Sequence, residues 1–317
     1  MGKIGVVISK KSMNQRSLTV LGTASQVPTM DRNHVGFFLR WDKEGILIDP
    51  GEGTQRQLLL AGISASRIKK ILISHFHGDH CLGLPGVVQR LSLLGEGREV
   101  DIFYPASGQK YLNNLLEAAV FYRNVKLNLH PVSSPGIVFN SEDLIITAYP
   151  LEHRTDTWGY RIKEADRRTL LPQMLPAGLQ GRAIGELKEK GSIDFQGKTI
   201  TLEEVSEPRI GQCFGYLPDT RMCENAIKLA RDADMLLSEA TYLFSESVQA
   251  EKYFHLTARQ AAQIAKQAGA KKLVLFHYSQ RYKRLKPFSR EAGEVHPDVT
   301  AARDLQEIPL PKRQRNL

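Results

Sequence analysis

The chain of 317 residues is 42% hydrophobic and 24% charged, with a formal net charge of +9, which is the composition of a globular protein long enough to bury a core. Its three scattered cysteines exclude a disulfide framework, and no apolar run has the length of a membrane span. Because the first residues lack a long apolar signal-peptide core, we expect a cytoplasmic protein with no membrane partner.

The first half of the chain alternates strand-like and helix-like segments. Alternating or continuous apolar runs predict strands at residues 17–21, 35–41, 45–49, 71–74, 100–104, 125–129 and 144–148. Helix-forming runs cover residues 54–61, 81–94 and 107–121, and Ser64 begins a further short, capped helix. Strands followed by helices are typical of a layered α/β domain.

This alternation stops between about residues 165 and 208 and then resumes. Several prolines and glycines there surround one amphipathic piece at residues 184–190, so we interpret the segment as an insertion with little core of its own. After it, helices are predicted at residues 222–233 and 257–268, and strands at 235–239 and 273–277. The second half therefore repeats the α/β pattern of the first.

A histidine-rich loop directly follows the strand predicted at residues 71–74. It places His75, His77, Asp79 and His80 within six positions, with a glycine between them. Imidazole nitrogens and carboxylate oxygens are zinc ligands, and a tight turn can direct one pair at one ion and the second pair at another. Two metal ions held in this way form the clamp of many phosphodiesterases. The alternative is a surface loop that happens to be rich in histidine.

Three further ligand candidates each follow a strand-like run: His153, Asp219 and His277. Polar residues at the C-terminal ends of strands lie on the rim of an α/β sheet, where such sites are usually built. Asp219 is the natural bridge between two cations, because a carboxylate has two oxygens. A single histidine at a strand end is more often a structural residue, but three candidates in this order after the loop support one another.

The chain resembles the ribonuclease Z family of transfer RNA 3′-end endonucleases, in its short, single-domain form. The His75–His80 loop is common to the whole metallo-β-lactamase superfamily. The blocks PGEGTQRQ at residues 50–57 and HYSQRY at 277–282 narrow the likeness to this family, and LGTASQVP at 21–28 and FHLTA at 254–258 also match. The resemblance implies the α/β fold of that superfamily, an αββα sandwich, as a single domain over residues 1–317 with an inserted, flexible exosite arm at about 165–208.

The resemblance also implies two zinc ions per subunit and a role for each site residue. One ion is held by His75, His77 and His153, the other by Asp79, His80 and His277, and Asp219 is shared. Asp79 further serves as general base or orienter of the attacking hydroxide. Glu239 orients or polarises His255, which protonates the departing oxygen.

Substrate contacts are expected from two places in the chain. Arg281, just beyond His277, is suited to pair with a phosphate. Arg32 and Asn33 belong to the loop at residues 28–33, which in the family helps to discriminate the 3′ end of transfer RNA. That loop departs from the family, because Met30 replaces the usual lysine. The arm departs too, since it lacks the Gly-Pro pair that the family often carries there.

These features predict a zinc-dependent endoribonuclease that cleaves precursor tRNA 3′ of the discriminator nucleotide, leaving a 3′-hydroxyl on the tRNA and a 5′-phosphate on the trailer. Basic residues cluster after His277 and at residues 1–16, which favours a large polyanionic substrate unless they form only a solvated surface. The alternatives are a metal-dependent hydrolase of small phosphodiesters or lactones, and an RNA-binding protein with a vestigial site. The family resemblance implies a homodimer.

One residue outside the ligand set has two readings. Asp49, at the end of the strand predicted at residues 45–49, can accept an N–H from a ligand histidine and so fix its tautomer. It can equally be an ordinary turn or N-cap aspartate. Both readings stay open on the sequence alone.

Overall fold

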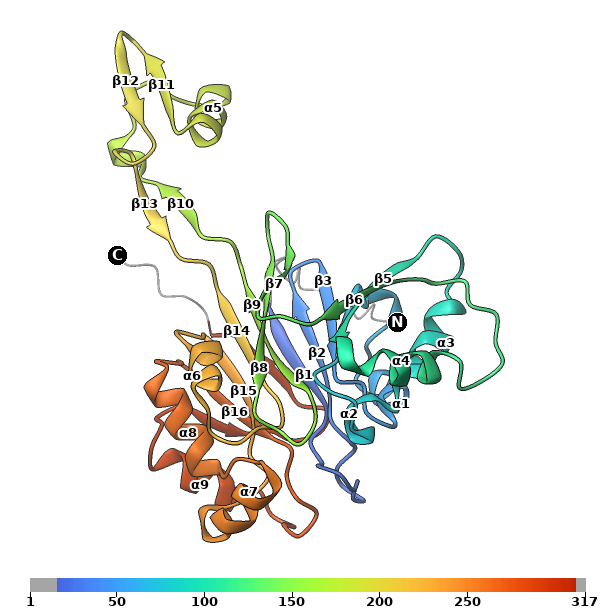
Figure 1. Ribbon diagram of the computed structural model, residues 1–317. Coiled ribbons are helices and arrows are strands. Elements are labelled where there is room, and N and C mark those ends of the chain that lie inside the picture. The colour runs from blue at the N-terminus through green and yellow to red at the C-terminus, as the bar shows by residue number, and fades with distance from the viewer. Residues whose placement is uncertain (1–15, 312–317) are drawn as a thin grey trace, which may run out of the picture.

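The computed structural model describes residues 16–311, so the basic stretch predicted at residues 1–16 lies almost wholly outside the described residues, as does the end of the chain. Within that range two seven-stranded sheets pack face to face (Figure 1). The first has the order β18-β1-β2-β3-β4-β5-β6. Its strands are β1 Ser17–Gly22, β2 Gly36–Trp41, β3 Glu44–Ile48, β4 Lys70–Leu72, β5 Glu99–Pro105, β6 Lys126–Val132 and β18 Glu307–Pro309.

The second sheet has the order β17-β16-β15-β14-β9-β8-β7. Its strands are β7 Gly136–Asn140, β8 Ile145–Leu151, β9 Thr157–Lys163, β14 Cys213–Leu217, β15 Met235–Glu239, β16 Leu273–Phe276 and β17 Val299–Ala301. Because β14, β15 and β16 run parallel and β9 is antiparallel to both β8 and β14, strand β8 runs in the same direction as that group. The C-terminal ends of these four strands therefore meet at one edge.

Helices cover the outer face of each sheet. On the first sheet lie α1 Thr54–Leu60, α3 Leu84–Ser92 and α4 Gln109–Leu116, and on the second lie α6 Glu224–Ala230, α8 Ala258–Gln267 and α9 Lys286–Gly293. Two short helices, α2 Gly78–Cys81 and α7 Ser247–Tyr253, lie near the strand ends. The predicted α/β fold, an αββα sandwich, is confirmed. Among residues 16–311 no helix combines the length and the apolar character needed to cross a membrane.

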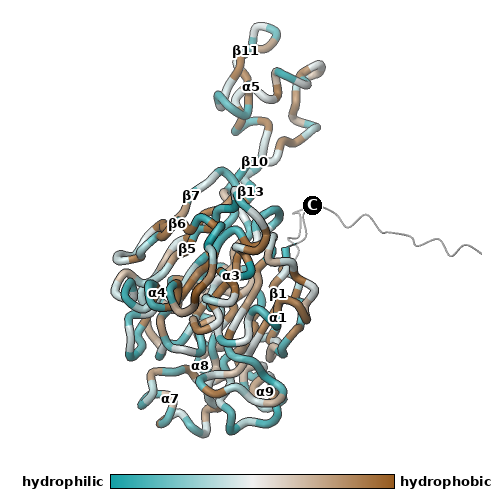
Figure 2. Tube along the Cα trace, turned by 90° about the vertical axis from the view of Figure 1, so that its right-hand side faces the viewer, coloured by the Kyte–Doolittle hydropathy of each residue, from teal (hydrophilic) through white to brown (hydrophobic). Residues whose placement is uncertain are grey.

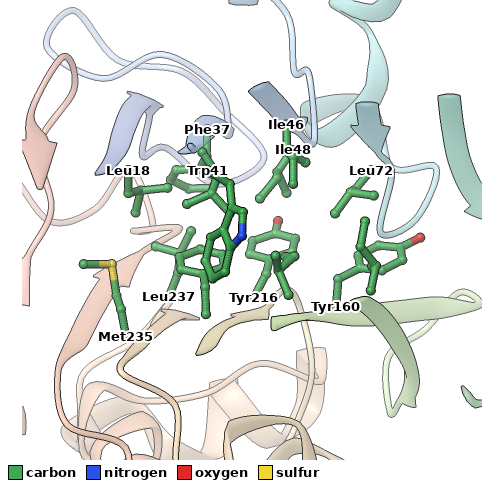
Figure 3. Packing of buried hydrophobic residues seen from close by; sticks show 14 of the residues in the cluster. Leu18, Phe37, Trp41, Ile46, Ile48, Leu72, Tyr160, Tyr216, Met235 and Leu237 are labelled. Atoms are coloured by element: carbon green, nitrogen blue, oxygen red, sulfur yellow. The ribbon is translucent and has the colours of Figure 1, made fainter. Parts of the chain in front are cut away.

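The central strands of both sheets are mostly apolar because they are buried on both faces. Side chains alternate between the two faces of a strand, so neighbouring residues join different layers of the core. Phe37 and Leu39 point between the sheets, whereas Phe38 packs under the helices of the first sheet. Between the sheets, aromatic and aliphatic side chains interlock, and the rings of Phe37 and Tyr216 meet across the layer with centroids 5.9 Å apart (Figure 3).

An arm projects from the end of the sandwich where β9 ends and β14 begins (Figures 1 and 2). It contains β10 Arg167–Leu170 paired with β13 Ser206–Arg209, the hairpin of β11 Ser192–Phe195 and β12 Lys198–Thr201, and helix α5 Arg182–Lys190. Leu179, Leu187 and Val205 form a small core inside the arm, separate from the body. The arm thus has more regular structure than the single amphipathic piece expected from the sequence.

Two helix predictions were wrong in extent. The helix expected at residues 81–94 begins earlier and is broken at Leu82 and Gly83, because a Cβ on Gly83 would lie 2.0 Å from the carbonyl oxygen of Gly51. This close approach needs a glycine. The helix expected at residues 107–121 ends at Leu116, since residues 117–120 are exposed and have no apolar face to bury.

Candidate metal centre

Seven of the predicted site residues meet at the edge where the parallel strands end. His75, His77, Asp79 and His80 come from the loop and helix that follow β4. His153 follows β8, Asp219 follows β14 and His277 follows β16. The ligand atoms of His75, His77, His153 and Asp219 lie within 4.8 Å of one another, and so do those of Asp79, His80 and His277.

Asp219 lies between these two groups and is 2% exposed. Its Oδ2 is 3.8 Å from Nε2 of His75 and 3.8 Å from Nε2 of His153. Its Oδ1 faces the other way, 3.5 Å from Nε2 of His80 and 3.3 Å from Nε2 of His277. One carboxylate thus presents one oxygen to each group of ligands, which is the arrangement of a bridge between two cations.

Asp49 fixes the ring nitrogens of two histidines. Its Oδ2 accepts from His80 Nδ1 at 2.7 Å and also from the hydroxyl of Ser74 at 2.5 Å. Because the Ser74 hydroxyl gives its only hydrogen to Asp49, its oxygen accepts from His75 Nδ1, 2.9 Å away. Both imidazoles therefore donate through Nδ1 and turn Nε2 toward the cluster.

The same pattern holds on the second sheet. His153 Nδ1 donates to the carbonyl oxygen of Phe254 at 3.0 Å. The Thr241 hydroxyl donates to Glu239 at 2.7 Å, so it accepts from His277 Nδ1, also at 2.7 Å. These two histidines as well present Nε2 to the cluster, and each has a neighbour that holds its ring in place.

The electrostatics of the site call for a cation. Burial lowers the pKa of His75 and His77, and it lowers the pKa of His153 to about 4, so the three imidazoles that face one another are neutral. His77 Nδ1 lies only 3.1 Å from Nε2 of His75 and 3.4 Å from Nε2 of His153. Neutral nitrogens that converge in this way direct lone pairs at a common point.

Two further atoms of the second group are buried without a partner. Among the described residues His80 Nε2 and Asp219 Oδ1 have no hydrogen bond, although such groups are normally satisfied. Asp79 is held as a carboxylate, because His80 and His277 lower its pKa despite its burial. Five imidazoles and two carboxylates with this geometry fit divalent zinc, which takes nitrogen and oxygen ligands.

A hydrogen-bonded pair, Glu239 and His255, lies beside the cluster. Glu239 is fully buried, and its Oε1 accepts from His255 Nδ1 at 2.9 Å. Burial lowers the pKa of His255, but the carboxylates of Glu239 and Asp219 outweigh it and raise the pKa to about 9. A protonated imidazole whose Nδ1 is held by a carboxylate leaves Nε2 to donate a proton to a substrate.

The predicted substrate-binding residues differ in their exposure and in the contacts that they make. Arg32 is 7% exposed, and its guanidinium donates to the carbonyl oxygens of Ser279 and Tyr282, so it holds the loop after His277 rather than presenting charge to solvent. Asn33 donates its side-chain amide to the carbonyl oxygen of Glu52 at 2.7 Å. Both side chains position loops around the centre.

Arg281 lies at the surface beside the centre. Its guanidinium pairs with Glu246 and lies 5.2 Å from the centroid of the Tyr242 ring. Met30 projects fully into solvent from the tip of the 28–33 loop. A phosphate can reach the guanidinium of Arg281 by displacing Glu246 from this ion pair. Met30 carries no charge.

Apart from Asp49, the residues that orient the histidines by bonding their Nδ1 atoms were not predicted from the sequence. Ser74 and Thr241 gave a weak signal, since each lies within two residues of a site residue. Phe254 gave none, because it acts through its backbone carbonyl. Asp49 combines both readings offered for it: it has a turn conformation with φ of 43°, and it accepts from a ligand histidine.

The chain is similar to known proteins over nearly its whole length. The profile of the metallo-beta-lactamase superfamily matches residues 31–180, and that of the beta-lactamase superfamily domain matches residues 199–278. A protein from Nocardia farcinica named ribonuclease Z is 50% identical over 306 residues, covering 95% of this chain and all of the relative. A ribonuclease Z from Protochlamydia amoebophila is 45% identical over 301 residues, covering 95% of this chain and 98% of the relative.

Among solved structures, the short form of human tRNase Z superposes with a TM-score of 0.69 at 26% sequence identity. The superposition covers 93% of this chain and 100% of the human chain. A diphosphatase of the PhnP family, 19% identical with a TM-score of 0.63, shares the fold. Both the sandwich and the arrangement of its strands are thus found in proteins of this superfamily.

Proposed function

Because the chain belongs to the ribonuclease Z family of metal-dependent, tRNA-processing endoribonucleases, we propose that it binds two zinc ions and cleaves precursor tRNA 3′ of the discriminator nucleotide. The products are a 3′-hydroxyl on the tRNA and a 5′-phosphate on the trailer. The main observation in support of the proposal is that the two carboxylate oxygens of Asp219 face different histidines. Oδ2 faces one set and Oδ1 faces the other. A precursor tRNA substrate supports a cytoplasmic location.

In this proposal His75, His77 and His153 would hold one ion, Asp79, His80 and His277 would hold the other, and Asp219 would be shared. When bound, two such ions supply positive charge that acidifies water and neutralises phosphate oxygens. Asp79 orients the attacking water and accepts its proton. His255 donates a proton from Nε2 to the departing 3′ oxygen while Glu239 holds its Nδ1.

The fold supports a large RNA substrate and two cooperating subunits. The arm leaves the sandwich from the end opposite the metal centre, because it joins the C-terminal end of β9 to the N-terminal end of β14 (Figure 1). An RNA held by one arm is therefore far from the centre of the same subunit and suits the centre of a partner. We propose a homodimer, which a mass measurement in solution tests directly.

Cleavage mapping tests the proposed reaction. Purified protein is incubated with precursor tRNAs that carry or lack an encoded CCA, with zinc and with a chelator. We expect one cut after the discriminator nucleotide, abolished by the chelator and by Asp219→Asn. Cleavage only at other positions, or full activity of the Asp219→Asn variant, would contradict the proposal.

A comparison with a small chromogenic phosphodiester separates this function from a general phosphodiesterase. The exposed basic residues Lys283, Arg284 and Lys286 lie six to nine residues after His277 and favour a polyanion. We expect kcat/KM on precursor tRNA to exceed that on the small diester by several orders of magnitude and to fall with rising salt. Equal efficiencies would support the small-molecule alternative.

A further inference from the structure

The turn that follows α7 carries two contacts of the metal centre. Phe254 has φ of 58°, a left-handed conformation that bulky residues rarely adopt. Its carbonyl oxygen accepts the hydrogen bond from His153 Nδ1, and the next residue is His255, the partner of Glu239. The position of this one turn therefore sets both the orientation of a ligand and the place of the proton donor.

Packing alone holds α7 weakly. Ala250 is the one fully buried residue of this seven-residue helix, while Val248 is 76% exposed. Helices in proteins are stabilised mainly by burying an apolar face, and a short helix with so little buried surface gains little in this way. Other contacts must fix the turn at Phe254.

Arg221 joins this turn to the loops that carry two ligands. It lies two residues after the bridging carboxylate, and its backbone N–H donates to the carbonyl oxygen of Glu152, beside His153, at 3.0 Å. Its Nε donates to the carboxylate of Glu152 at 2.7 Å, and Nη1 donates to Glu251 of α7 at 3.3 Å. The guanidinium also lies over the Phe254 ring, 4.8 Å from the ring centroid.

Arg154 makes a parallel connection from the other side. It directly follows His153, and its Nη2 donates to the carbonyl oxygen of Lys252 at 2.8 Å. Its guanidinium lies 4.9 Å from the centroid of the Tyr253 ring. Two arginines, each within two residues of a ligand, thus hold consecutive residues at the C-terminal end of α7.

We propose that Arg221, assisted by Arg154, is a positioning residue that clamps the α7 turn onto the metal centre and thereby fixes His153 and His255. The inference rests on the proposed function, because it takes the histidine and aspartate cluster as the metal site. A planar guanidinium is suited to this task, since it forks between two carboxylates while stacking on an aromatic ring. Lysine has neither the fork nor the flat face.

An ordinary surface ion pair is the competing reading. Exposed ion pairs add little to stability, and the side chains of Arg221 and Glu251 are 38% and 64% exposed. That reading predicts no effect on metal binding. The clamp predicts a specific loss of metal affinity. Mutation of a residue that holds a metal ligand in place typically lowers metal affinity or activity about 10- to 100-fold.

Zinc affinity of the full-length protein tests the clamp, measured by competition with a chromogenic chelator. For Arg221→Met we expect one of two zinc ions to bind about 10-fold more weakly, because His153 loses its fixed orientation. Arg259→Met is the matched control: its side chain is 37% exposed, pairs with Glu294 and lies 5.1 Å from the Phe244 ring centroid. The control should bind zinc as the natural protein does.

Two further measurements separate a positioning role from a structural one. Arg221→Met should lower kcat on precursor tRNA with KM nearly unchanged, since the turn holds His255 and not the RNA. Arg221→Lys, which keeps the charge, should recover only part of the loss. Melting curves recorded with chelator should coincide for Arg221→Met and Arg259→Met.

The outcomes are distinguishable. If Arg221→Met binds both ions as tightly as the natural protein, the clamp is overturned. If Arg221→Met does not fold, Glu251→Gln removes the pair from the exposed α7 side and should weaken zinc binding in the same direction; unchanged affinity there also overturns it. If the natural protein binds zinc but leaves precursor tRNA intact, the proposed function fails while the affinity comparison still decides the role of Arg221.

Discussion

Three residues at the metal centre hold backbone conformations that favour glycine. Asp49, Phe254 and His277 have φ of 43°, 58° and 64°. Such conformations cost on the order of 1–3 kcal/mol each and persist where the surroundings over-determine them. Here each is held by a contact at the site: Asp49 and His277 through their side chains, and Phe254 through its carbonyl oxygen. The strained residues therefore lie where the orientation of the histidine rings is set.

Loss of His255, the proposed proton donor, should affect the chemistry and leave metal binding unchanged. We predict that His255→Ala lowers kcat about 100- to 10,000-fold, the usual contribution of a general acid, while zinc content stays the same. His255 is held by Glu239 and is not among the proposed ligands, so metal binding does not require it. Single-turnover cleavage and zinc analysis of the same sample check this. A loss of zinc in the variant would instead make His255 a ligand.

A charged cluster at the opposite end of the sandwich gives a pH-dependent stability. Partial burial acts to raise the pKa of Glu164, but the guanidinium of Arg16, 2.9 Å away, outweighs it and lowers this pKa. A lowered pKa means that the contribution to stability is complete above the unfolded value, about 4.3, and is lost as the pH falls through the folded value.

We therefore predict that Glu164→Gln lowers the free energy of unfolding by about 1 kcal/mol at pH 7, because the pairs with Arg16 and Arg209 are lost. The difference from the natural protein should shrink as the pH falls below about 4. Denaturant titrations at pH 7 and at acid pH provide the measurement. A difference that stays constant over this range would show that the charge of Glu164 is not its cause.

The loop between β4 and α3 depends on elements packed against it from outside. Phe76, which lies between two ligand histidines, turns its ring away from them and onto Gly108, at the start of α4. A Cβ on Gly108 would lie 2.0 Å from a carbon of that ring. The ring also meets Tyr104 and Tyr111, with centroids 6.5 and 6.0 Å away. The ligand loop is therefore held by packing as well as by hydrogen bonds.

We predict that Gly108→Ala lowers the free energy of unfolding by about 1–3 kcal/mol, the usual cost of overpacking, and also weakens zinc binding because Phe76 must move. Thermal melting with and without zinc measures both effects. Gly185→Ala is the control: Gly185 lies in helix α5 with nothing within 4 Å of an added Cβ, so alanine there should stabilise slightly. Equal behaviour of the two variants would refute the packing argument.

In the molecule as a whole, the arm and the metal centre are separate units at opposite ends. The arm has its own small apolar cluster, and its base is a pair of strands in which Leu170 lies opposite Ser206. The two strands can therefore be joined by a two-residue turn without disturbing the sheet below. The body keeps its three apolar clusters when the arm is removed.

We predict that replacing residues 171–205 by an Asn-Gly turn leaves zinc binding and hydrolysis of a small phosphodiester unchanged. Cleavage of precursor tRNA should fall at least 10-fold through KM, because we propose that the arm contributes RNA binding and not chemistry. Steady-state kinetics on both substrates give the comparison. If small-diester hydrolysis fell equally, the arm would be required by the centre itself.

Much of the centre could be predicted because its residues follow strands in sequence. The buried runs before His75, His153 and His277 identified strands, and parallel strands bring their C-terminal ends to one edge. Arg32 shows where this reasoning stopped, since a motif position does not reveal whether a guanidinium faces RNA or the backbone of Ser279. Exposure is a property of the packed chain.

The α/β layers, the proposed ligand set and the family could be read from the order of the residues, because apolar periodicity and residue chemistry are local properties. How these parts act together depends on the packing of the two sheets and their loops. This packing placed one oxygen of Asp219 toward each group of histidines, and it brought Arg221 over Phe254. Distances between residues far apart in the chain depend on how two sheets and their loops pack, and no local pattern records them.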